Sequence, residues 1–132
     1  SLGLAASRRG FHLERVAVNL IDARIPDNAG AQPLDLPVAK NGPAAAFTTL
    51  PVKAMTAALL VAGQDAQVSY SAGSFVCNQL FYVLMRCRLP QAGFLHLGGD
   101  LDVPTVVRGV RIALAAAIGR SEDLATSAGR ID

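Results

Sequence analysis

Residues 66–86 read AQVSYSAGSFVCNQLFYVLMR, and this stretch decides the fold. Its first five residues are typical of a short strand, and residues 79–86 show the apolar spacing of a helix. Gly73 lies where the strand must turn sharply into the helix, and Ser74 is the expected N-cap. Strands that alternate with helices predict a parallel or mixed sheet that helices cover on both faces.

Cys77 falls in the first turn of that helix. Free backbone N–H groups and the positive end of the helix dipole lie there, and both favour a thiolate over a thiol. This place is typical of a nucleophile, although a cysteine in an apolar chain is also often an inert, buried residue. Cys87 lies too far along the same helix to form a disulfide with Cys77. Two unpaired cysteines favour a reducing compartment, and we expect the cytoplasm.

A cysteine nucleophile needs a base, and the chain has 2 histidines. His96 closes an apolar strand over residues 92–97, and functional groups gather at the carboxyl ends of strands in an open α/β sheet. We therefore expect His96 to lie beside Cys77. His12 leads into the first expected strand, and we interpret it as a surface residue.

Glu14 is the candidate for a carboxylate that orients the base. It opens a strand-like stretch, so the alternative is a solvated charge at a strand end. The remaining elements follow from apolar spacing, proline and glycine. They are a strand over 15–20, a proline-rich loop over 23–49, a helix from Pro51 to Gly63, a helix over 104–118 and a frayed tail over 121–132.

The composition of the chain limits the classes of protein to which it can belong. With 132 residues and 52% hydrophobic side chains, the chain is long enough for one core. A net charge of +2 is too small to indicate nucleic-acid binding, and Arg8-Arg9 is too short a basic run to indicate it. No apolar stretch reaches the ~18 residues of a membrane span. The cysteines and histidines lack the clustered spacing of a zinc site, so no metal is expected.

Three motifs resemble those of the pyroglutamyl peptidase I family, also called pyrrolidone-carboxylate peptidases. Residues 71–78, SAGSFVCN, are similar to the cysteine motif of that family. Residues 14–19, ERVAVN, and 22–28, DARIPDN, resemble its glutamate motif and the loop that follows. Residues 92–96, AGFLH, resemble its histidine motif. The motifs stand in the order of the family, and the resemblance covers nearly the whole chain.

The resemblance implies a role for each of five residues. Cys77 is the implied nucleophile, His96 the general acid and base, and Glu14 the residue that orients His96. Phe75 is implied to line the pocket for a pyroglutamyl ring, and Arg24 to lie close to the site. The implied activity is that of a thiol protease, a hydrolase that removes N-terminal pyroglutamate from peptides without a metal or organic cofactor. The implied fold is a three-layer α/β/α sandwich with a mixed, mostly parallel sheet.

The chain also departs from the pattern of the family, which has a strand and an aromatic-bearing turn ahead of the segment that Ser1 opens. We therefore expect residues 1–132 to form a single, N-terminally incomplete domain whose sheet lacks its N-terminal strand. An uncovered sheet favours association, so a homo-oligomer is expected. The alternative function is that of a truncated, catalytically inactive relative, which acts as an interaction module or has no independent function.

Overall fold

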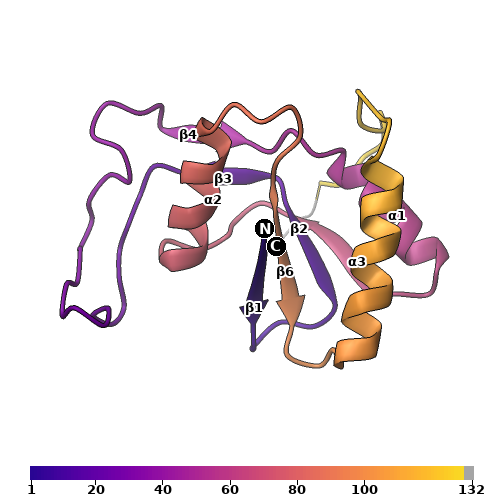
Figure 1. Ribbon diagram of the computed structural model, residues 1–132, viewed down its shortest axis with the longest axis horizontal. Coiled ribbons are helices and arrows are strands. Elements are labelled where there is room, and N and C mark those ends of the chain that lie inside the picture. Colours follow the sequence, from indigo (N-terminus) through magenta and orange to yellow (C-terminus); the bar gives the residue numbers. More distant parts are fainter. Residues whose placement is uncertain (130–132) are drawn as a thin grey trace.

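The computed structural model describes residues 1–129 and arranges them in three layers (Figure 1). Helix α2 covers one face of the main sheet, and helices α1 and α3 lie side by side on the other. This is the α/β/α arrangement that the alternation of strands and helices predicts. The elements are β1 Leu2–Ala5, β2 Phe11–Glu14, β3 Val16–Val18, β4 Ala45–Phe47, α1 Val52–Val61, β5 Ala66–Ser69, α2 Val76–Arg86, β6 Phe94–Gly98 and α3 Val103–Ala117.

The main sheet has four strands in the order β1-β6-β2-β5. Strand β6 runs parallel to β1 and antiparallel to β2, and β2 runs parallel to β5. The sheet is therefore mixed and mostly parallel, as expected. His96 in β6 lies in register with Gly3 of β1 on one side and His12 of β2 on the other. Because directly opposed residues share a face of a sheet, these three positions face the same way.

Two apolar clusters pack on the opposite faces of the sheet, because alternate residues of a strand point to opposite sides. The larger cluster joins Phe11 and Leu13 of β2 to the inner sides of α1 and α3. The smaller cluster joins Phe94 of β6 to Phe81 of α2. Helix α3 approaches β2 closely at Gly109, where a Cβ atom would overlap the ring of Phe11.

The first half of the chain differs from the sequence prediction. One strand is predicted over 15–20, whereas the chain forms two strands that separate at Arg15. Strand β2 ends at Glu14 inside the main sheet, and β3 pairs with β4 in a separate two-stranded sheet. The partner of each strand is set by residues far away in the chain, which apolar spacing does not reveal. Strands β1 and β4 were not predicted, and β4 consists of two alanines and Phe47, with little strand propensity.

The polar segment after α3 packs onto α1, so the predicted fraying is wrong for residues 121–129. Asp123 accepts hydrogen bonds of 2.9 Å from the backbone N–H groups of Lys53 and Ala54, and so caps the first turn of α1. The Lys53 ammonium in turn donates to the carbonyl of Thr126 at 2.6 Å. The last three residues of the predicted tail lie outside the described residues.

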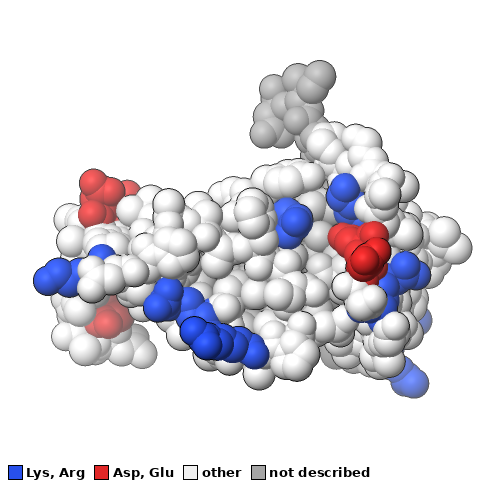
Figure 2. All heavy atoms as spheres, turned by 90° about the horizontal axis from the view of Figure 1, so that it is seen from above, with Lys and Arg blue, Asp and Glu red and all other residues white. Residues whose placement is uncertain are grey.

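Figure 2 shows Lys and Arg in separate groups on the face seen from above, with uncharged surface and a few Asp and Glu between them. This agrees with a net charge of +2 that is not gathered into one basic stripe on this face. Within residues 1–129, no helix combines the length and the apolar character that a membrane crossing requires.

Candidate active site

Cys77 lies at the start of α2, as the sequence predicts. The backbone leaves β5 through Gly73, whose φ of 82° belongs to the left-handed region that favours glycine. Phe75 takes the N-cap position, and its carbonyl accepts the first helical hydrogen bond, from Gln79 N–H at 3.0 Å. The backbone N–H groups between these two residues precede the hydrogen bonds of the helix. Ser74 is therefore not the N-cap, and its hydroxyl donates to a carbonyl of the long loop instead.

The thiol of Cys77 lies over the backbone of β1 at Gly3. A Cβ atom at Gly3 would lie 3.1 Å from Cys77 Sγ and 2.7 Å from Phe94 Cζ. The missing side chain thus leaves the space that the thiol and the Phe94 ring occupy. Strand β1, which the sequence analysis did not identify as a strand, forms the floor of the site.

Gly3→Ala is expected to lower the free energy of unfolding by about 1–3 kcal/mol, because the added methyl group overfills a packed site. Urea unfolding of the variant and the parent protein measures this difference. Gly129→Ala is the matched control, since a Cβ at Gly129 meets no atom of the described chain within 4 Å. Equal loss of stability in both variants would contradict the role of Gly3.

His96 and Glu14 form a buried pair on neighbouring strands. The Nδ1–H group of His96 donates to Oε1 of Glu14 at 2.7 Å. The Glu14 side chain is fully buried, and His96 is 5% exposed. The interpretation of Glu14 as a solvated charge at a strand end is therefore wrong. Glu14 closes β2 rather than opening the next strand, and its position next to His96 is the one the resemblance implies.

His96 shares a cavity with Cys77 for a different reason from the one expected from the end of its strand. Strand β6 runs antiparallel to β2, and β2 is parallel to β5, so the carboxyl end of β6 lies at the opposite edge from that of β5. His96 meets the site from the middle of its strand, because its side chain and that of Gly3 share the face under α2. Cys77 and His96 both line one cavity, as the expected arrangement requires.

His12 is 7% exposed in the centre of β2, so its interpretation as a surface residue is wrong. Its Nε2–H group donates to the carbonyl of Arg9 at 2.9 Å, and its Nδ1 accepts from the Gln67 amide at 2.9 Å. Burial lowers the pKa of His12. The ring is therefore held as a neutral imidazole with both nitrogen atoms engaged.

A cavity of about 420 Å³ brings the predicted residues together. Cys77, His96, Phe75 and Arg24 all line it, and Glu14 lies behind His96. Thiol, imidazole and buried carboxylate form the set of groups that covalent acyl transfer uses. Within residues 1–129, no three His, Cys, Asp or Glu side chains are grouped so that they could hold a metal ion.

The electrostatics of Cys77 correct one expectation. Burial raises the pKa of the Cys77 thiol, and the charge of Glu14 raises it further, while the charge of Arg8 lowers it. Burial and the charge of Glu14 therefore oppose the preference for a thiolate that the helix N-terminus gives. His96 is the titratable side chain from the sheet that lines the same cavity as Cys77.

Arg8 is the residue of the site that sequence reasoning missed. Its guanidinium donates to Oε1 of Glu14 at 3.0 Å, and it lines the cavity of Cys77. In the sequence it is one half of Arg8-Arg9, a basic run too short to indicate any function. No periodicity distinguishes it from Arg9, whose side chain is 81% exposed.

Comparison with known proteins agrees with the family resemblance of the three motifs over nearly the whole chain. A sequence model of the family described as "Pyroglutamyl peptidase" matches residues 1–112. The pyrrolidone-carboxylate peptidase of Chromobacterium violaceum is 43% identical over 143 aligned residues, covering 99% of this chain and 68% of that protein. The protein of the same name from Pseudomonas fluorescens is also 43% identical, covering 98% of this chain and 67% of its own length.

Solved structures agree with the sequence matches. Pyroglutamyl peptidase I from Bacillus amyloliquefaciens superposes with a TM-score of 0.90 at 37% identity, covering 96% of this chain and 68% of that chain. The pyrrolidone carboxyl peptidase from Thermococcus litoralis also gives a TM-score of 0.90, at 30% identity over 96% of this chain and 69% of its own. The chain belongs to the pyroglutamyl peptidase family, a family of cysteine peptidases with an α/β fold.

Proposed function

We propose that this protein is a cysteine peptidase that removes N-terminal pyroglutamate from peptides, with Cys77 as nucleophile. The observation that carries the proposal is the cavity that joins Cys77 to His96, with Glu14 2.7 Å behind the imidazole. Because Nδ1 of His96 donates to Glu14, Nε2 is the ring atom left to exchange a proton with the thiol. Membership of the family supports the choice of substrate.

The reaction proceeds by acyl transfer. His96 takes the thiol proton while Sγ of Cys77 attacks the pyroglutamyl carbonyl carbon, and the carbonyl oxygen becomes an oxyanion. The free backbone N–H groups at the start of α2, where Cys77 lies, stabilise that charge in this proposal. The imidazolium then protonates the leaving amine, and a thioester to pyroglutamate remains. Water, deprotonated by His96, hydrolyses the thioester and restores the thiol.

Glu14 orients His96 for these proton transfers. Its Oε1 atom fixes which nitrogen of His96 carries the proton and stabilises the imidazolium that forms during attack. Because Glu14 is fully buried, water does not compete for this hydrogen bond.

Phe75 and Arg24 belong to the substrate side of the site. Both line the cavity, Phe75 from the N-cap of α2 and Arg24 from the long loop. A pyroglutamyl ring is small and uncharged, so an apolar wall such as Phe75 with Leu4 and Ala72 suits it better than an ion pair. Arg24 is exposed, which places it to meet the peptide that follows the ring.

The proposal treats residues 1–132 as one domain, since both apolar clusters pack against the same sheet. It places the protein in the cytoplasm, because Cys77 and Cys87 are both free. It includes association of copies of the chain through apolar surface. Val76, Leu80 and Val83 of α2 are each about half exposed and support this part.

The test is hydrolysis of a pyroglutamyl aminocoumarin amide by the purified protein. We expect turnover of this substrate and none of the prolyl amide, which has the same ring size but lacks the lactam carbonyl. We also expect iodoacetamide to abolish turnover. A folded protein that leaves the pyroglutamyl amide intact would favour the alternative of an inactive relative that acts as an interaction module.

A further inference from the structure

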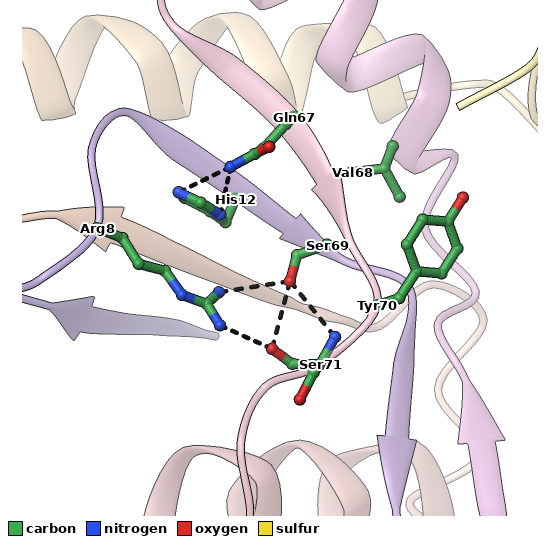
Figure 3. A pocket seen from close by; sticks show the side chains of 7 residues that line it. All are labelled: Arg8, His12, Gln67, Val68, Ser69, Tyr70 and Ser71. Atoms are coloured by element: carbon green, nitrogen blue, oxygen red, sulfur yellow. Dashed lines mark hydrogen bonds between the residues drawn. The ribbon is translucent and has the colours of Figure 1, made fainter. Parts of the chain in front are cut away.

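Arg8 joins the buried base to the segment that leads to the nucleophile. It lies in the connection between β1 and β2, and its side chain is 32% exposed. Its Nη1 donates to Glu14 Oε1 at 3.0 Å and to Ser69 Oγ at 3.4 Å, and Nη2 donates to the carbonyl of Ser71 at 2.9 Å. Figure 3 shows the guanidinium pointing between Ser69 and Ser71.

These partners lie on two separate parts of the site. Glu14 ends β2, while Ser69 ends β5 and Ser71 follows it on the way to Cys77. Arg8 also lines both the cavity of Cys77 and the neighbouring cavity of about 290 Å³ in Figure 3. The planar guanidinium can hold several acceptors in one fixed geometry, which a flexible ammonium cannot do.

The carboxylate of Glu14 is held through one oxygen atom. Oε1 accepts from both His96 and Arg8, at 2.7 Å and 3.0 Å. Within residues 1–129, Oε2 is buried and has no hydrogen-bond partner. A fully buried carboxylate needs a nearby cation to stay charged. His96 gains and loses its charge during the reaction, so Arg8 is the permanent cation beside Glu14.

We propose that Arg8 is a positioning residue of this reaction, which holds Glu14 aligned behind His96 and fixes the segment leading to Cys77. This inference rests on the proposed function. It also predicts an effect at the thiol itself, because Arg8 is a cation of the site that does not exchange protons. Among the described residues, the charged or titratable groups that line the cavity of Cys77 are His96 from β6 and Arg8 and Arg24 from loops, and Glu14 of β2 acts on the thiol through its charge.

The sign of that effect follows from the charges. Burial and Glu14 raise the pKa of Cys77, and Arg8 lowers it. Removing the cation therefore raises the pKa further, and less thiolate is present at any pH below it. Alkylation of Cys77 by iodoacetamide reports this fraction and does not require peptidase activity.

The experiment compares Arg8→Met, Arg8→Lys and Arg9→Met, all in a Cys87→Ser background so that Cys77 is the one thiol. Arg9→Met is the matched control, because Arg9 carries the same charge one residue away but is 81% exposed and 3.8 Å from Asp100. For each variant we measure kcat and KM on the pyroglutamyl amide, the pH dependence of alkylation, and thermal unfolding.

Arg8→Met is expected to lower kcat by about tenfold or more, the effect of losing a charge-assisted hydrogen bond, with KM little changed. Its alkylation profile is expected to move to higher pH. Arg8→Lys keeps the charge, so the alkylation profile is expected to match the parent, while kcat falls because an ammonium does not hold Glu14, Ser69 and Ser71 together. Arg9→Met is expected to match the parent in both measurements.

An unchanged alkylation profile in Arg8→Met would overturn the inference, whether kcat falls or not, since lower stability alone does not shift that profile. Parent-like kcat in either Arg8→Lys or Arg8→Met would overturn it as well. If Arg8→Met does not fold, the kcat of Arg8→Lys decides whether the inference stands. A parent protein without peptidase turnover but with the alkylation shift in Arg8→Met would refute the proposed function, while leaving the link between Arg8 and Cys77 supported.

Discussion

Cys77→Ser and His96→Ala are each expected to lower turnover of a pyroglutamyl amide by about three orders of magnitude or more. Without Cys77 there is no thiol to form the thioester. Without His96 the partly buried thiol loses the base proposed to take its proton, while burial and the charge of Glu14 both raise the pKa of Cys77. Single-substrate kinetics on the folded variants, checked by circular dichroism, measures both effects.

Two matched controls accompany these variants. Cys87→Ser removes the other thiol, which is exposed at the end of α2, and turnover is expected to stay at the parent value. His12→Gln removes the other histidine, which is buried against Arg9 and Gln67 and lines the neighbouring cavity rather than that of Cys77. High turnover in His96→Ala together with its loss in His12→Gln would move the role of base to His12.

The place of Cys77 could be predicted because the information is local. A strand, a glycine in the left-handed region at Gly73 and a helix follow one another within residues 66–86, and each is set by its own residues. The first turn of the helix then fixes the position of the thiol relative to free N–H groups. The cysteine motif and the fold class could therefore be inferred from the sequence.

The surroundings of Cys77 depend on pairing between distant strands, which the local pattern does not contain. Apolar spacing marks β6 as a strand but does not say that it runs antiparallel to β2. For this reason the strand end does not explain where His96 lies, although His96 and Cys77 line the same cavity. The same limit applies to His12, whose burial follows from its position between two strands rather than from its neighbours in the sequence.

Arg8 shows most clearly what the local sequence pattern does not reveal. Arg8 and Arg9 are identical in type and adjacent in sequence, yet one bonds Glu14 and the other is 81% exposed. The difference arises because the connection between β1 and β2 turns Arg8 toward the end of β5, where Ser69 and Ser71 lie. Only the folded chain brings these three segments together.

Glu14→Gln is expected to lower turnover by about a hundredfold, less than the loss in Cys77→Ser or His96→Ala. The amide keeps the shape of the carboxylate but loses the charge that stabilises the His96 imidazolium. Some proton transfer through His96 remains, because the imidazole still lies in the cavity of Cys77. The kinetic measurement is kcat on the pyroglutamyl amide across pH.

The same variant is expected to alkylate faster, and this separates the two roles of the charge. The charge of Glu14 raises the pKa of Cys77, so its removal lowers that pKa and leaves more thiolate at neutral pH. Iodoacetamide needs only the thiolate, whereas the peptidase needs an aligned imidazole that returns the proton to the leaving amine. Slower alkylation of Glu14→Gln than of the parent would show that Glu14 stabilises the thiolate through His96 more than it opposes it directly. The resting site would then hold an ion pair of thiolate and imidazolium rather than a thiol beside a neutral base.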